Sequence, residues 1–180
     1  MGSVIYIATL AVAAYDVAAE QAGFMLIPLV LASSAGSVLF GRWLNLLGSR
    51  LVMLSGFGSL ALGAGLLGLT GLGMGLFFLA SMLFGLGVGI VVGGTLRTIV
   101  LNEVASEQRG VAQGLVNIGI AIGNLLAVAV LGIVADSRPG LDGLGLAYLV
   151  AAGLMLVALL LSLGLKPRHQ EQVAVAASGA

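Results

Sequence analysis

The ten residues GRWLNLLGSR (residues 41–50) separate two long apolar stretches and carry two arginines. The stretches on either side, about 23–44 and 50–70, are each long enough to cross a bilayer, because a transmembrane helix needs about 20 apolar residues. Glycines near both ends of the link, Gly41 and Gly48, permit a tight reversal of the chain. We therefore expect GRWLNLLGSR to be a short hairpin between two membrane-spanning helices.

The composition of the whole chain indicates that lipid surrounds most of it. Of 180 residues, 60% are hydrophobic and 8% are charged, whereas a soluble domain has about 25% charged residues. The net charge of zero argues against a nucleic-acid partner. The chain has no cysteine and a single histidine, His169, so we expect no metal site and no cofactor.

Six apolar segments of spanning length follow one another along the chain. We therefore expect an all-α polytopic membrane protein with six transmembrane helices, at about 3–19, 23–44, 50–70, 76–101, 111–135 and 144–165. The links between them are rich in turn residues, as in TGLGMG at 70–75 and DSRPGLDG at 136–143. Residues 1–165 form the predicted membrane domain, and residues 166–180 form a polar tail.

Basic residues are distributed unevenly between the two predicted membrane sides. The opposite side has only Arg138, whereas the side of GRWLNLLGSR has Arg42, Arg50, Arg109, Lys166 and Arg168. Because cytoplasmic links carry an excess of Lys and Arg, we expect the side that contains GRWLNLLGSR to be cytoplasmic. Both termini lie on this same side. The expected location is the inner membrane of a bacterium.

Three amide side chains recur in the fifth predicted span, at Gln113, Asn117 and Asn124. Their spacings of four and seven place them on one helix face. One interpretation is interhelical hydrogen bonding, at about 0.6 kcal/mol per contact. The other is the lining of a water-filled path or binding cavity.

Arg97 is a basic residue inside the fourth predicted span. An intramembrane charge marks a functional site by default. However, Arg97 precedes Asn102 by five residues, about 7–8 Å along the axis, so it can also extend to the interface or pair with an acid in the next link. Both interpretations are open. Arg97 and the three amides are the candidates for substrate contact or gating.

Glycines recur at four-residue spacing in the fourth and fifth spans. The fourth span contains Gly85, Gly89 and Gly93, and the fifth contains Gly119 and Gly123. Small residues at this spacing allow helices to pack closely. A role in helix bending is also compatible with the pattern.

The link GRWLNLLGSR resembles the short cytoplasmic loop motif of the major facilitator superfamily. Gly41, Gly48 and Arg50 fit that motif, with Arg42 beside it, and Asn45 stands where an aspartate is usual. Residues 85–136 are similar to spans ten and eleven of the drug:proton antiporter branch, and AGFMLIPLVLASSAGSVLFGR resembles span eight. Since an amide cannot hold a cation as a carboxylate does, Asn45 weakens any charge relay in the loop.

The resemblance covers about residues 4–165 and implies the carboxy-terminal six-helix half of a transporter, itself a 3+3 inverted repeat. It implies alternating access for a solute bound between two halves. An apolar lining with only amides and hydroxyls suits a small lipophilic or amphipathic solute better than a highly charged one. The second half is then another copy in a homodimer or a separate six-helix unit, unless the chain is part of a longer one. The alternative is a non-transporting subunit or assembly factor of a larger membrane complex. The sequence contains no recognisable nucleophile–base pair and no phosphate-binding loop, so we do not expect an enzyme.

Overall fold

The computed structural model describes residues 7–12, 19–69, 73–95, 100, 104 and 106–164. Within these residues, five helices are long and apolar enough to cross a membrane. In chain order the elements are α2 (Ala19–Met25), α3 (Ile27–Leu47), α4 (Ser49–Gly68), α5 (Met74–Ile90), the π-helical turn η1 (Val91–Thr95), the 3-10 turn η2 (Ser106–Gln108), α7 (Arg109–Asp136) and α8 (Leu141–Ser162).

Five of the six predicted spans therefore coincide with described helices. The first, at about 3–19, is described at residues 7–12, which are helical, and at the start of α2. The sixth helix and the inverted repeat thus remain predictions. The polar tail at 166–180 lies outside the described residues.

The second span is interrupted near its start. The turn at Leu26 separates α2 from α3, and Pro28 occupies the first turn of α3. Proline lacks a backbone N–H and is tolerated where that donor has no helical partner. Helical bonding resumes when the Val30 N–H donates to the Leu26 carbonyl at 3.0 Å.

The link GRWLNLLGSR is mostly helical, whereas the expected short hairpin placed the whole link between the two helices. Helix α3 continues to Leu47 and α4 begins at Ser49, so the chain reverses at Gly48. Gly48 has φ 81° and ψ 158°, a conformation that is essentially restricted to glycine. The prediction that Gly41 also serves the reversal is wrong, because Gly41 lies inside α3.

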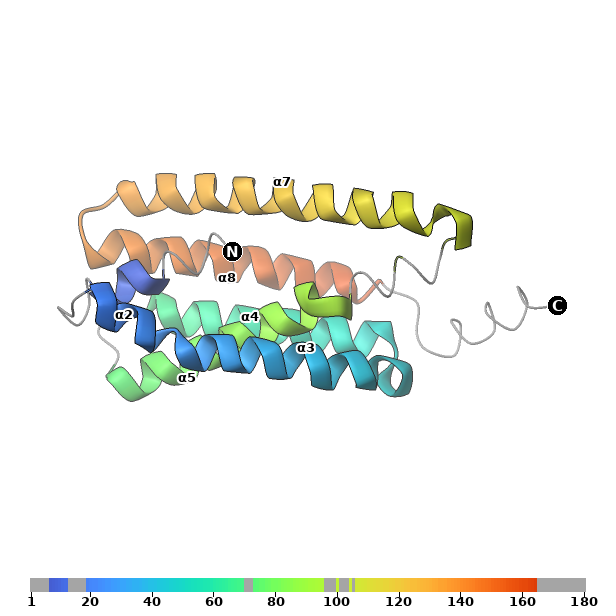
Figure 1. Ribbon diagram of the computed structural model, residues 1–180. Helices are drawn as coiled ribbons and strands as arrows, with labels where there is room; N and C mark the ends of the chain where they lie inside the picture. The colour runs from blue at the N-terminus through green and yellow to red at the C-terminus, as the bar shows by residue number, and fades with distance from the viewer. Residues whose placement is uncertain are drawn as a thin grey trace.

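The helices pack side by side along a common direction (Figure 1). Helix α5 packs against α3 and α4, α4 packs against α8, and α8 packs against α7. Helix α7 lies on the side of α8 away from α3 and α5 (Figure 1). Its 28 residues span about 42 Å at 1.5 Å per residue, which exceeds a hydrocarbon core of about 30 Å.

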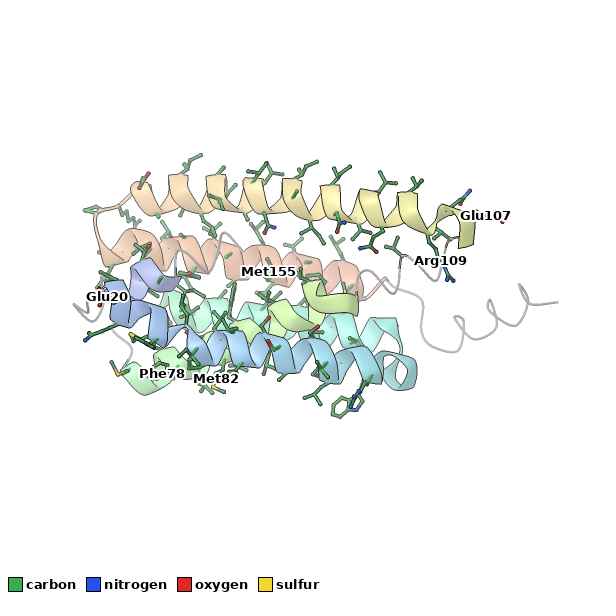
Figure 2. The ribbon with its side chains drawn as sticks, viewed as in Figure 1. Glu20, Phe78, Met82, Glu107, Arg109 and Met155 are labelled. Atoms are coloured by element: carbon green, nitrogen blue, oxygen red, sulfur yellow. The ribbon has the colours of Figure 1, made fainter. Side chains whose placement is uncertain are left out.

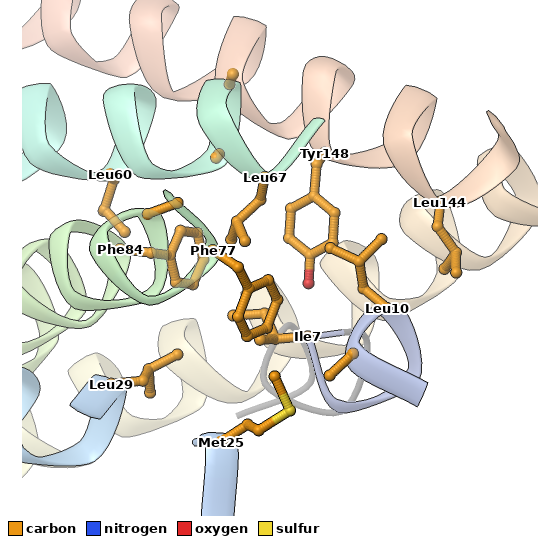
Figure 3. Close-up of a cluster of buried hydrophobic side chains, with 14 of the residues drawn as sticks. Ile7, Leu10, Met25, Leu29, Leu60, Leu67, Phe77, Phe84, Leu144 and Tyr148 are labelled. Atoms are coloured by element: carbon orange, nitrogen blue, oxygen red, sulfur yellow. The ribbon is translucent and has the colours of Figure 1, made fainter. Parts of the chain in front are cut away.

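The main hydrophobic core lies at the end of the bundle where α2 and α8 begin (Figures 1 and 3). Phe77 and Phe84 of α5 and Tyr148 of α8 supply its aromatic rings. The rings of Phe84 and Tyr148 meet edge to face, with centroids 6.5 Å apart and planes at 88°. A smaller cluster forms toward the opposite end from Val52 and Ile90, with Phe40 packed against it.

Candidate functional site

Helix α7 has two different faces, and its amides share the less exposed one. Gln113 and Asn124 are half-buried, and Asn117 is exposed at the edge of this face. Leu131 is buried and lies 18 residues, or about five full turns, beyond Gln113 on the same face. The amide face is therefore directed toward the rest of the chain.

The opposite face of α7 is apolar and open. Its side chains are between 53% and 73% exposed, and they are Val111, Leu115, Ile118, Ile122 and Ile133. Such a face suits lipid, whereas an amide in hydrocarbon needs a hydrogen-bonding partner. The amide face of α7 is therefore directed toward the rest of the chain, next to the contact between α7 and α8.

Arg97 cannot be joined to this face, because it lies outside the described residues. Helix α5 ends at Ile90 and continues as the π turn η1 up to Thr95. The structure thus brings the three amides onto one face, and the association of Arg97 with them stays a prediction.

The glycines of the fourth span lie directly against α3. A β-carbon at Gly85 would overlap the Leu29 carbonyl oxygen, and one at Gly89 would overlap the Ser33 carbonyl oxygen. One at Gly93 would overlap the Ser37 hydroxyl. The absence of side chains at these three positions allows α3 and α5 to approach closely.

The two glycines of the fifth span have different surroundings. In the described part of the chain, no atom lies within 4 Å of a β-carbon placed at Gly119 or Gly123. Both residues are exposed on α7. Their spacing matches that of the α5 glycines, but the structure shows no helix of this chain against them among the described residues.

The loop-motif residues lie around the reversal between α3 and α4. Gly41 and Arg42 are exposed, Gly48 is buried, and Arg50 is half-buried. Asn45 belongs to α3, and its side chain lies outside what the structure describes. Arg109 marks the same end of the bundle, whereas Glu20 lies at the opposite end (Figure 2).

The aromatic pair beside Arg42 also lies at this end. The rings of Phe40 and Trp43 meet edge to face with centroids 5.5 Å apart. Trp43 is 46% exposed. Tryptophan next to arginine is typical of the membrane–water interface.

Two serine hydroxyls that join helices were not identified from the sequence. Ser37 of α3 donates to the Gly93 carbonyl at 2.8 Å, and Ser59 of α4 donates to the Leu83 carbonyl at 2.7 Å. Ser37 and Ser59 thus each bond to a neighbouring helix segment. A serine can bond to its own helix, to a neighbour or to water, so the sequence alone carries no signal for this choice.

The long apolar helices and the polar face of α7 define a polytopic integral membrane protein. The family model of the Major Facilitator Superfamily matches residues 1–179. The chain belongs to that family and is a membrane transporter of the major facilitator type, a family of transporters and not of enzymes. Comparisons with curated proteins and with solved structures found no match.

Proposed function

We propose that this protein moves a small lipophilic or amphipathic solute by alternating access, with the amide face of α7 lining part of the route. The observation that carries this proposal is the separation of amides and exposed aliphatic side chains onto opposite faces of α7. Amides and hydroxyls in an otherwise apolar lining suit such a solute better than a highly charged one.

We also propose that the chain acts opposite a second six-helix unit. In this superfamily the substrate site lies near the bilayer midplane between two such units. The resemblance to the carboxy-terminal half, with its 3+3 inverted repeat, supports this arrangement. A second copy of the chain, related by a twofold axis, is our first choice for the partner, and a separate six-helix unit is the other.

The proposed orientation places the end with Arg42, Arg50 and Arg109 in the cytoplasm, together with both termini. The location of Arg109 and Glu20 at opposite ends (Figure 2) supports it. The proposed membrane is the bacterial inner membrane, and the proposed branch is that of the drug:proton antiporters.

A flux assay tests the proposed route. The protein in proteoliposomes is offered a panel of fluorescent amphipathic dyes, beginning with ethidium, with and without a proton gradient. We expect protein-dependent dye movement that falls at least about tenfold when Asn117 and Asn124 are both changed to leucine, which corresponds to about 1.4 kcal/mol or more.

The matched control changes Ile118 and Ile122, on the opposite face of α7, to leucine, and its flux should equal that of the wild type. Undiminished flux in the amide variant would reject the proposed route. If no dye moves and the chain copurifies from its membrane within a larger complex, the alternative of a non-transporting subunit is favoured.

Native mass spectrometry of the protein extracted from its own membrane tests the partner. A mass of twice the 18.0 kDa chain is the expected result for a homodimer. A monomer or a complex with other chains would reject the homodimer.

A further inference from the structure

The π turn η1, which follows α5 directly, has a different hydrogen-bonding register from α5. Residues Val91–Thr95 form a π turn, in which hydrogen bonds run from i to i+5, so it holds one residue more than an α-helical turn. Conversion of this turn to α-helix would rotate the following chain by about 100° and shift it by about 1.5 Å.

The part of α5 that precedes the turn is fixed on both sides. A β-carbon at Gly87 would lie 2.7 Å from the Leu60 backbone nitrogen and 2.8 Å from the Gly56 carbonyl oxygen, both on α4. A β-carbon at Gly89 would overlap the Ser33 carbonyl oxygen on α3. Since this segment has no room to rotate, a change of register must move the chain after the turn.

Ser37 holds the π turn from the side. Its hydroxyl donates to the Gly93 carbonyl at 2.8 Å, within the turn itself. A serine in a helix can also donate to the carbonyl four residues earlier in the same helix, which for Ser37 is that of Ser33. A change of the Ser37 rotamer would bring its hydroxyl to this second acceptor. The hydrogen bond to Gly93 can therefore open without leaving the Ser37 hydroxyl unpaired.

We propose that Val91–Thr95 is a two-register switch in α5, and that the Ser37–Gly93 hydrogen bond holds it in the π register. The switch couples the position of α3 to the direction of the chain after Thr95. This inference concerns the internal mechanics of the helix pair and does not depend on the identity of a solute.

Electron-spin distance measurements test the switch directly. The chain has no cysteine, so nitroxide labels can be placed at Leu62→Cys, which is an exposed position on α4, and at Val100→Cys, beyond the turn. We expect one main distance in the otherwise wild-type protein. Ser37→Ala should add a second population displaced by about 3 Å or more, as the rotation and axial shift require.

Three further variants keep the test decisive. Ser59→Ala removes a similar hydrogen bond to the regular part of α5 and should leave the distance unchanged. Gly93→Ala breaks the Ser37 contact from the other helix and should reproduce the second population, also where Ser37→Ala does not fold. Deletion of Gly94 removes the extra residue, so Ser37→Ala should then have no effect.

The result that would overturn the switch is a single unchanged distance in both Ser37→Ala and Gly93→Ala. The switch would also be overturned if Ser37→Ala broadened the distance distribution between the labels equally in the protein with Gly94 and in the protein without it. Because the labels report distances in the absence of solute, this outcome is independent of whether the flux assay succeeds.

Discussion

Gly89 of α5 lies against the Ser33 carbonyl of α3 so closely that a β-carbon would overlap the oxygen. The neighbouring atom belongs to the backbone, which cannot move away as a side-chain end can. We therefore expect Gly89→Ala to lower the free energy of unfolding by about 1–3 kcal/mol, the usual cost of overpacking. The melting temperature of the purified protein in detergent measures this effect.

Gly119→Ala is the matched control for this substitution. Its helix also carries glycines at four-residue spacing, but a β-carbon there meets no atom within 4 Å in the described residues. We expect a change in stability within about 1 kcal/mol. Equal destabilisation by Gly89→Ala and Gly119→Ala would contradict this explanation. It would show that the close approach of α3 and α5 is not the reason why glycine is required at Gly89.

A second prediction concerns the reversal between α3 and α4. Gly48 has φ 81° and ψ 158°, and any other residue in this region of backbone space costs about 1–3 kcal/mol. We expect Gly48→Ala to lower the melting temperature. Gly41→Ala should not lower it, because Gly41 is helical and open. A greater loss at Gly41 would contradict the assignment of the turn.

These two glycines show which parts of the fold the sequence determines. Hydropathy summed over about 20 residues is insensitive to single positions, so the five described spans were predicted to within a few residues, apart from the end of the fourth span at about 101, which lies outside the described residues. The position of the reversal depends on one backbone conformation. Composition permitted that conformation at Gly41 and at Gly48, so the sequence did not distinguish them.

The candidate site shows the same limit. The shared face of Gln113, Asn117 and Asn124 follows from helical periodicity and was predictable. The different surroundings of Gly89 and Gly119 were not predictable. Glycine spacing indicates that another helix can approach closely, but it does not indicate whether a helix is present there. The π turn and the Ser37 hydrogen bond arise from packing between helices, which leaves no local pattern.

A third prediction concerns Ser81 in the core. Its hydroxyl is fully buried and has no hydrogen-bond partner among the described residues. An unsatisfied buried polar group costs about 1–3 kcal/mol. We therefore expect Ser81→Ala to raise the melting temperature or leave it unchanged.

Ser59→Ala provides the opposite case on the neighbouring helix. This serine donates to the Leu83 carbonyl at 2.7 Å, and its loss should lower stability by about 0.5–1.5 kcal/mol. The two serine-to-alanine changes should therefore shift thermal unfolding in opposite directions, or only Ser59→Ala should lower it. Destabilisation by Ser81→Ala would indicate that its hydroxyl has a bound partner in the protein.

The last prediction concerns the edge-to-face contact between Phe84 and Tyr148 in the main core (Figure 3). Tyr148 is 2% exposed, so Tyr148→Ala should cost about 3–5 kcal/mol through lost burial and a cavity. Leu161→Ala, at a position that is 74% exposed on α8, should cost much less.

A double-mutant cycle with Phe84→Leu and Tyr148→Leu separates the ring contact from simple burial. Each single variant keeps an apolar side chain and removes the edge-to-face geometry. An aromatic pair of this kind contributes about 0.5–1.5 kcal/mol beyond its buried area, so the double variant should lose less stability than the two single variants added together. Strict additivity would mean that the rings stabilise α5 and α8 only by filling space. In that case the geometry of the pair would follow from helix packing and would not help to determine it.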